Sequence, residues 1–477
     1  MKRILAMMLV IIMALALFAC GGTGGDTGSG DSGGGNNGPA VASEAPKDDT
    51  KEWPEAAGFF DATYDYSKAK KFKVGYLVSA SSFLYDEFDK AFVDWAARMN
   101  INYTGMWAPA AASVDEYMSG IETFVDQGYD GFLLDADVTL YPQVSALCDS
   151  LGIPWISCMG QAREAEQYMF GNQRIAGRLL SPNAGFNNTQ FGVDMVDKLV
   201  EWKEEAWPDV PWEKVGVISI DFSFSPQLHE RTDGAEIRWA EISGLGEYNP
   251  DSTINPPNFF IADTISGTLD QVTAQNLVVQ ILSNPGDVEI WLVAGAIDDF
   301  AMGAANAAEN LGITDKVCSV CIGGSSLPPQ WDVGTFTSWR YAEFTAQSVY
   351  AEPLIAALWS MMAGQATREE LWPEWVKIWD KGDVYQLTDE LFPPFNLPGV
   401  KLEGGVPVTS ETHSYATLLL PTQWLDKDTY QVYLEWTDLY AYGDGAEGHY
   451  KYDKVSDLDL FTARIPVPAE YNTYPVG

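Results

Sequence analysis

Hydrophobic and polar residues follow two repeating patterns from residue 72 onward. Short runs rich in apolar and β-branched residues alternate with longer stretches in which apolar residues recur every three or four positions. The short runs predict buried strands, and the long stretches predict amphipathic helices. A first series gives strands and helices in alternation: strands at 73–79, 131–136 and 153–159, and helices at 85–99, 114–128 and 140–152.

A second series of the same kind follows a connecting region near 181–188. It predicts strands at 214–220, 288–296 and 316–324, and helices at 227–243, 273–286 and 298–312. Two such series predict an α/β fold with two doubly wound parallel-sheet lobes joined by a hinge. Ligands of these sheets bind beyond the carboxyl ends of the strands, where Phe83 and Tyr85 follow the first strand.

The first 50 residues have a different composition. Lys2 and Arg3 precede an apolar run, which predicts a signal peptide over 1–19. The residues before Cys20, Leu-Phe-Ala, resemble a bacterial lipobox and predict lipidation of Cys20, and a plain signal peptide cleaved nearby is the alternative. Glycine and serine dominate most of 20–50, which is therefore expected to be a flexible tether to a lipid anchor on the outer face of the cytoplasmic membrane or in the periplasm.

The charge balance restricts the possible partners. The chain has 28 Lys and Arg against 67 Asp and Glu, a formal net charge of −39. Such a chain repels nucleic acid and anionic lipid surfaces, so we expect no nucleic-acid partner and membrane attachment only through the lipid. The acidic residues are expected to form a solvated surface rather than a binding patch.

Cysteine and histidine are too sparse to suggest a metal site. Cys318 and Cys321 are three apart in an expected strand, so their side chains point to opposite faces. We therefore expect packed thiols, no metal and no cofactor. A bridge between Cys148 and Cys158 stays open as an alternative.

Five stretches together resemble one family. They are "KVGYLVSASSFLYDEF", "GYDGFLLDADVTLYPQVSALCDSLGIPWIS", "NNTQFGVDMVDKL", "VGVISIDFSFSPQLHERTDGAEI" and "VEIWLVAGAIDDFAMGAANAAENLG". In this order they are similar to type I periplasmic sugar-binding proteins of ABC transporters, the ribose and galactose binders. The resemblance covers roughly 72–365, with a return strand near 406–420. It implies a protein that captures a sugar or related polar solute between two lobes and delivers it to an ABC transporter permease.

The resemblance also implies how the chain divides. It assigns 72–185 and about 341–365 to an N-terminal lobe, and 186–340 and about 405–420 to a C-terminal lobe. The remainder, 421–477, is then a C-terminal extension. This part of the chain is rich in Trp and Tyr, which we expect to be core residues rather than a carbohydrate-binding surface.

Ligand contacts follow from the same resemblance. The implied set is Ser81, Phe83, Tyr85 and Asp135 in the first lobe, Arg231 and Asp298 in the second, and Trp339 and Arg340 near the hinge. Each has a local alternative: Phe83 and Tyr85 as a helix-start hydrophobic contact, Asp135 as a helix cap, and Arg231 as a surface ion pair.

Three positions depart from the family pattern. The chain has Met159-Gly160, Ile297 and Gly323-Gly324 where ribose binders carry hydrogen-bonding side chains. The ligand is therefore expected to be polar, but not necessarily a common pentose or hexose. Two other functions are compatible with the sequence: a binding protein coupled to a membrane sensor, and a glycoside hydrolase using paired acids such as Asp298 and Asp299. No catalytic motif accompanies these acids, so we expect no enzyme activity.

Overall fold

The structure is a computed structural model, and it describes most of the chain between residues 47 and 372. The described residues are 47–372 apart from 81–82, 111–112, 137–139, 159–167, 171–172, 176–179, 186–187, 250–251, 253, 265–269, 324–329, 332, 335–336, 345–346 and 369, and beyond these 384–385, 417–419, 422–428 and 430. The predicted signal peptide, Cys20 and most of the tether lie outside them. Within this part of the chain, no helix has the length and apolar character needed to cross a membrane.

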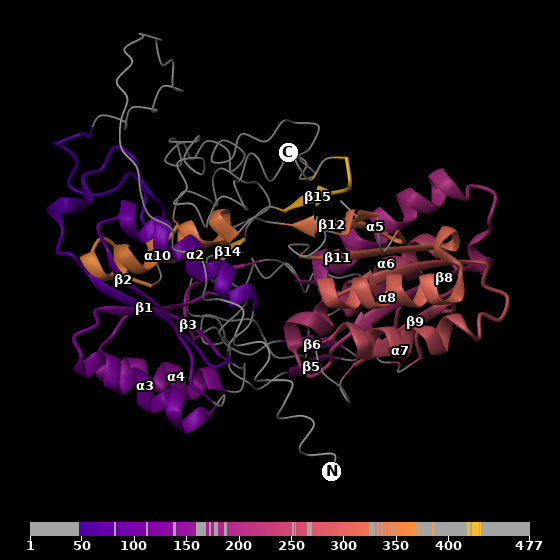
Figure 1. The fold of residues 1–477 in the computed structure, drawn as a ribbon, viewed down its shortest axis with the longest axis horizontal. Helices are drawn as coiled ribbons and strands as arrows, with labels where there is room; N and C mark the ends of the chain where they lie inside the picture. The colour runs from indigo at the N-terminus through magenta and orange to yellow at the C-terminus, as the bar shows by residue number, and fades with distance from the viewer. Residues whose placement is uncertain are drawn as a thin grey trace, which may run out of the picture. The chain divides into compact units, whose positions relative to one another are not determined.

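The first sheet is parallel except at one edge. Its order is β13-β14-β7-β4-β3-β1-β2, and only β13 runs antiparallel to its neighbour. Strands β1, β2, β3 and β14 are labelled in Figure 1. The strands are β1 (Lys73–Val78), β2 (Asn102–Trp107), β3 (Gly131–Asp135), β4 (Trp155–Ser157), β7 (Asn183–Gly185), β13 (Val384–Tyr385) and β14 (Thr417–Leu419). Its helices are α2 (Phe83–Arg98), α3 (Val114–Asp126), α4 (Tyr141–Leu151) and α10 (Gln347–Ala363).

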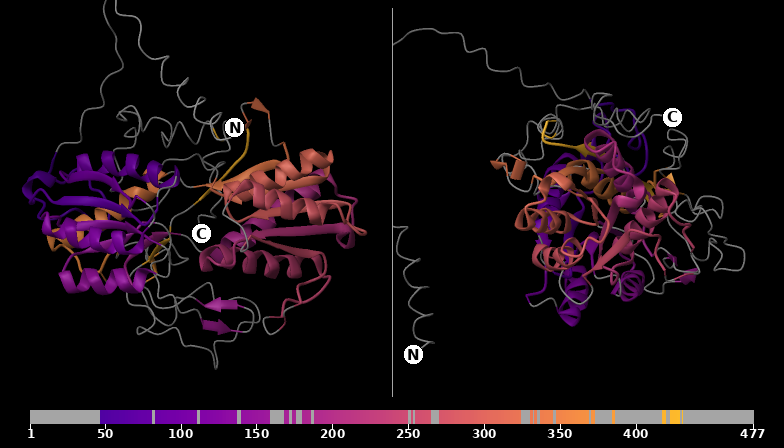
Figure 2. Two further views of the ribbon diagram at one scale, coloured as in Figure 1. Left: turned by 60° about the horizontal axis from the view of Figure 1, so that its bottom comes forward. Right: turned by 90° about the vertical axis from the view of Figure 1, so that its right-hand side faces the viewer.

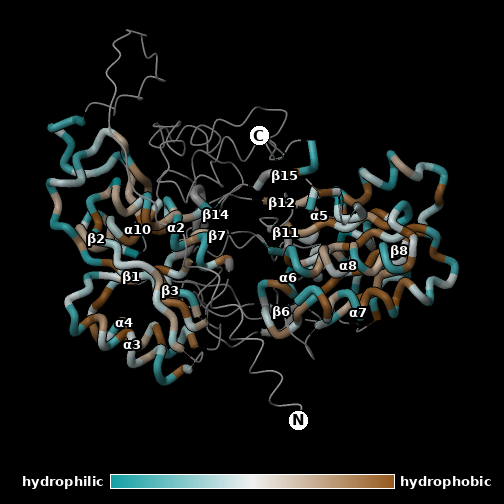
Figure 3. Tube along the Cα trace, in the orientation of Figure 1, coloured by the Kyte–Doolittle hydropathy of each residue, from teal (hydrophilic) through white to brown (hydrophobic). Residues whose placement is uncertain are grey.

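Alternating strand residues place these helices on two faces. Tyr76 and Val78 of β1 share a core with α2 and α10, whereas Leu77 between them packs with α3 and α4. This alternation is the period of two expected of a strand that is buried on both sides. Hydrophobic residues accordingly recur along the strands of both sheets (Figure 3).

The second sheet has the order β15-β12-β11-β10-β8-β9, with β15 antiparallel to β12. Its strands are β8 (Val215–Asp221), β9 (Phe259–Asp263), β10 (Ile290–Gly295), β11 (Val317–Ile322), β12 (Trp339–Phe344) and β15 (Gln423–Leu425). One face packs on α5 (Asn188–Ala206) and α6 (Pro226–Ser243), the other on α7 (Gln271–Leu282) and α8 (Asp298–Leu311). Short 3-10 turns lie at η1 (Tyr66–Lys68), η3 (Trp212–Lys214) and η4 (Thr314–Lys316). The hairpin of β5 (Tyr168–Phe170) and β6 (Gln173–Ile175) forms the pair of arrows in the left view of Figure 2.

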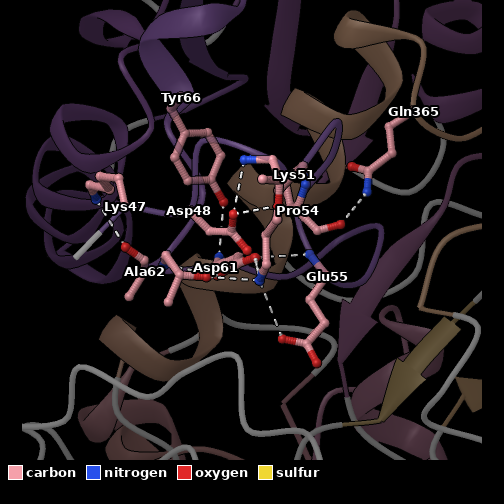
Figure 4. A network of polar contacts seen from close by, with 11 residues as sticks. Lys47, Asp48, Lys51, Pro54, Glu55, Asp61, Ala62, Tyr66 and Gln365 are labelled. Atoms are coloured by element: carbon pink, nitrogen blue, oxygen red, sulfur yellow. Dashed lines mark hydrogen bonds and ion pairs between the residues drawn. The ribbon is translucent and has the colours of Figure 1, made fainter. Parts of the chain in front are cut away.

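The segment before β1, which the sequence left unassigned, is part of the first lobe. Its buried Asp61 accepts a hydrogen bond from Lys51 Nζ at 2.7 Å and from the backbone N–H of Glu55 at 3.0 Å (Figure 4). Gly58 N–H donates to Ser360 Oγ of α10 at 3.0 Å, and Trp372 Nε1 donates to the Gly58 carbonyl at 2.9 Å. Residues 47–72 therefore form an N-terminal clasp over the last helix of the first lobe.

The pairing corrects three predicted boundaries. Strand β14 lies within the predicted return strand at 405–420, but it pairs with β7 in the first sheet rather than joining the second lobe. Strand β12 belongs to the second sheet, so of the range 341–365 only α10 packs on the first. Strand β15 extends the second sheet although 421–477 was predicted to be an extension. Such assignments depend on long-range pairing, which local pattern does not encode.

Candidate ligand-binding site

Asp135 lies at the carboxyl end of β3, as the sequence predicted, but it is buried. Its side chain is 1 % exposed, and Oδ2 accepts a hydrogen bond from the Tyr76 hydroxyl at 2.5 Å. Burial, reinforced by the neighbouring Asp135 carboxylate, raises the pKa of Tyr76 well above its usual value. Tyr76 therefore stays protonated and remains a donor to Asp135.

Two further tyrosines join the strand ends around Asp135. Tyr117 of α3 donates to the carbonyls of Leu77 and Asp135 at 3.3 and 3.2 Å, which links β1 to β3. The Tyr141 hydroxyl of α4 accepts from Ala136 N–H at 3.3 Å and lies 3.2 Å from Ser157 Oγ, which links β3 to β4. Burial raises the pKa of both phenols well above the usual value. The carboxyl ends of β1, β3 and β4 are therefore joined by a buried network of tyrosine hydroxyls.

Tyr85 is the predicted aromatic that reaches this edge. It lies in the first turn of α2, is half-buried, and packs edge-on to Tyr76 with ring centroids 6.2 Å apart. The structure thus brings Tyr85 and Asp135 together through Tyr76. Phe83 is the first residue of α2, and neither its side chain nor Ser81 is among the described parts.

Arg231 occupies the corresponding edge of the second sheet. It projects from α6 and donates through Nε to Asn188 Oδ1 at 3.0 Å and through Nη1 to the carbonyl of Ala296, just after β10. The guanidinium also lies over the Phe191 ring, 5.3 Å from its centroid. Burial lowers the pKa of Arg231 to about 10, which leaves it a cation at neutral pH. These contacts use two of its five N–H donors.

Asp298 lies beside this position, in the first turn of α8. The helix N-terminus stabilises a negative charge there. A side chain at Gly323 would place its Cβ 2.4 Å from Asp298 Oδ1, and the Gly323 backbone has φ +96°. The glycine that departs from the family pattern is thus required by the space that Asp298 occupies.

Glu343 is a site residue that the sequence analysis missed. It lies near the end of β12, is 2 % exposed, and accepts a hydrogen bond from Thr422 through Oε1. No described residue donates to its buried Oε2. Burial and then the nearby Asp194 raise the pKa of Glu343 well above its usual value, and the Arg231 charge opposes this rise. An acid at the end of an apolar strand was the only available signal.

Trp339 and Arg340 lie away from this edge. Trp339 is fully buried in a core with Ala301 and Cys321. Arg340 donates through Nη2 to the Thr314 carbonyl at 3.2 Å and lies over the Trp202 ring at 5.2 Å. Both side chains support the interior of the second lobe, so we remove them from the candidate ligand contacts.

The cysteines are packed thiols. All four described ones (Cys148, Cys158, Cys318 and Cys321) are buried and unpaired, so Cys148 and Cys158 are not bridged. The described residues also contain no group of three or more acidic, histidine or cysteine side chains placed to hold a metal ion. The chemistry at both sheet edges is therefore that of hydroxyl, carboxyl and guanidinium groups.

A family model described as "periplasmic binding protein domain" matches residues 74–332, more than half of the chain. The chain belongs to this family. The match covers both series of strands and helices, so the predicted family and the fold of two doubly wound lobes are confirmed. A comparison with curated proteins found no match.

Several solved structures are similar to this periplasmic binding protein. One is the fructose-binding periplasmic domain of a hybrid two-component system, with 12 % identity, 81 % of this chain and 99 % of that chain covered, and a TM-score of 0.51. Another is a periplasmic solute-binding protein of an ABC transporter from Actinobacillus succinogenes with bound D-allose (16 % identity, 62 % and 93 % covered, TM-score 0.47). A third is an ABC transporter solute-binding protein from Bacillus halodurans with bound myo-inositol. It has 12 % identity and a TM-score of 0.47, with 76 % of this chain and 98 % of that chain covered. At these identities the likeness concerns the fold.

Proposed function

We propose that this protein is an exported solute-binding protein that captures a sugar or polyol and delivers it to an ABC transporter permease. It is held to the membrane through lipidated Cys20 and the tether that follows. The protein binds its ligand without chemical turnover. Part-buried Tyr85 lies at the carboxyl edge of the first sheet and part-buried Arg231 at that of the second, and this observation carries the proposal.

The groups at the two edges suit a ligand rich in hydroxyls. Carboxyl groups such as Asp298 and Glu343 accept hydrogen bonds from hydroxyls, and Arg231 donates to hydroxyl oxygens. Tyr85 supplies an aromatic surface for the C–H face of a sugar ring. Asp135 accepts a hydrogen bond from Tyr76, and Tyr76 packs against Tyr85, so Asp135 helps to fix the position of the Tyr85 ring. A ligand that contacts residues of both lobes favours the arrangement in which it can touch both, so binding energy drives closure.

A thermal-shift screen of the chain from residue 21 onward tests this proposal. A ligand that binds only the folded protein raises the melting temperature. The panel holds matched sets of a neutral sugar, its amino sugar and its sugar acid, together with polyols, nucleosides and amino acids. We expect a neutral sugar or polyol to stabilise the protein and to be recovered unaltered. Stabilisation only by a nucleoside or an amino acid would contradict the sugar assignment, and conversion of the ligand would contradict the absence of turnover.

Sensing is the second candidate function, and the similarity to a domain of a two-component system favours considering it. The binding event would be the same, but closure would be read by a membrane receptor. Uptake of radiolabelled ligand in cells lacking this protein separates the two functions. Lost uptake supports transport, whereas normal uptake with a lost transcriptional response supports sensing.

A further inference from the structure

Helix α6 carries a second polar link besides Arg231. The His229 ring places Nδ1 2.5 Å from Asp221 Oδ2, and its Nε2 lies 3.6 Å from Asp233 Oδ1, one turn further along the helix. Asp221 is the last residue of β8 and is 0 % exposed. The imidazole therefore joins the carboxyl end of β8 to the first turns of α6.

The groups that face this imidazole are acidic. Asp221 comes from β8, and Asp233 and Glu236 come from α6 itself. His229 Nδ1 shares a hydrogen bond with Asp221, whereas Nε2 and Asp233 lie at ion-pair distance, beyond the reach of a hydrogen bond. The strand end is also fixed on the opposite side, because Thr264 donates to the Asp221 carbonyl through N–H and Oγ1, both at 2.9 Å. His229 is thus attached to a rigid point.

His229 and Arg231 hold α6 from two directions. Residues two apart in a helix point about 200° away from each other. His229 reaches β8, whereas Arg231 reaches Asn188 of α5 and the carbonyl after β10. Thr232 of α6 also bonds to β8 through Ser219 at 2.8 Å, so His229 is the link to this strand nearest the start of the helix, two residues from Arg231.

We propose that His229 is a positioning residue for ligand capture: by linking α6 to Asp221 it fixes Arg231 at the carboxyl edge of the second sheet. This inference rests on the proposed function, because it takes Arg231 to be a ligand contact. His229 itself acts through Arg231 and does not touch the ligand.

A double-mutant cycle tests the inference with the stabilising ligand from the screen. Dissociation constants are measured by calorimetry for the wild type, His229→Ala, Arg231→Ala and the double variant. We expect His229→Ala to weaken binding about tenfold in the wild type and to have little further effect in the Arg231→Ala background, since the effects of two residues are not additive when one acts through the other. His229→Asn retains an N–H donor close to the position of Nδ1 and is expected to recover most of the affinity.

Arg238→Ala is the matched control on the same helix. It removes contacts to Asp197 and Glu241 near the far end of α6 and leaves the carboxyl edge intact, so its affinity should match that of the wild type.

Equal affinities for His229→Ala and wild type would overturn the inference. So would an equal loss in both backgrounds, which would show that His229 acts independently of Arg231. A ligand that binds the wild type but is insensitive to Arg231→Ala would overturn it too, while leaving solute binding itself intact. If no compound in the panel binds the wild type, the result contradicts the proposed function itself, and the inference about His229 falls with it.

Discussion

Protonation of Asp233 should make the second lobe more stable in mild acid than in mild base. Asp233 is 7 % exposed, and burial, together with neighbouring acids, raises its pKa to about 7 even though His229 opposes the rise. An Asp side chain in an unfolded chain has a pKa of about 3.9. The folded state therefore binds this proton more tightly than the unfolded state does, and the resulting stabilisation is lost as the pH rises through about 7.

The size of the effect follows from the pKa. Between pH 6 and pH 8 the unfolded carboxyl is ionised throughout, whereas the folded one loses most of its proton. With a folded pKa of about 7, this difference lowers the free energy of unfolding by about 1.4 kcal/mol over that interval. Asp233→Asn cannot ionise, so its contribution should not change with pH.

Urea unfolding followed by tryptophan fluorescence measures this difference at pH 6 and pH 8. From pH 6 to pH 8 we expect the free energy of unfolding to fall by about 1.4 kcal/mol more in the wild type than in Asp233→Asn. Burial also raises the pKa of Glu236 to about 7, but Glu236 is present in both proteins and its contribution cancels in the comparison. Asp197→Asn, which removes a more exposed carboxylate from α5, is the control. Equal pH dependence of wild type and Asp233→Asn would refute the reasoning, because it would show that Asp233 does not titrate between pH 6 and pH 8 in the folded protein.

Three further predictions concern the carboxyl edges and the clasp. Tyr76→Phe removes the donor to buried Asp135 and should lower the free energy of unfolding by about 1–3 kcal/mol in urea titrations, whereas an unchanged value would show that Asp135 is satisfied without it. Gly323→Ala should destabilise the second lobe by about 1–3 kcal/mol, because its φ of +96° strains an L-residue and its Cβ would meet Asp298; a variant as stable as wild type would contradict this crowding. Asp61→Ala removes the acceptor of the Glu55 N–H and the buried partner of Lys51, which keeps Thr63 and Glu55. It should loosen the N-terminal clasp, measured as faster proteolysis near residue 61, whereas unchanged cleavage would show that the aromatic packing alone holds the segment.

The sequence predicted most clearly those elements whose own residues specify them. The strand expected at 73–79 is β1, and the helix expected at 298–312 is α8, because continuous apolar runs and helical spacing are local properties. Strand β2 was missed because it is an edge strand with no fully buried residue. Strand β7 is only Asn-Ala-Gly, and the sheet to which β14 belongs is decided by a partner more than 200 residues away in the chain.

The site was predictable to the same extent. Asp135 and Arg231 could be placed near strand ends because each follows or faces a strand that the pattern locates, and their role as ligand contacts stays a prediction. The sequence could not show that Asp135 is buried beneath Tyr76, because hydrogen-bond partners 59 residues apart leave no local signal. Trp339 was misplaced for a related reason: an aromatic residue at the start of a strand looks the same in sequence whether it packs inside or faces a ligand.

The N-terminal clasp also bears on how the protein is made. Gly58 and Ser360 are 302 residues apart, so the first lobe cannot complete its core until α10 has been synthesised. Contacts between such distant residues slow folding, because a long loop must close before they are gained. The N-terminal clasp is therefore one of the parts of the first lobe that complete their packing late, after α10 has emerged and closed a loop of 302 residues.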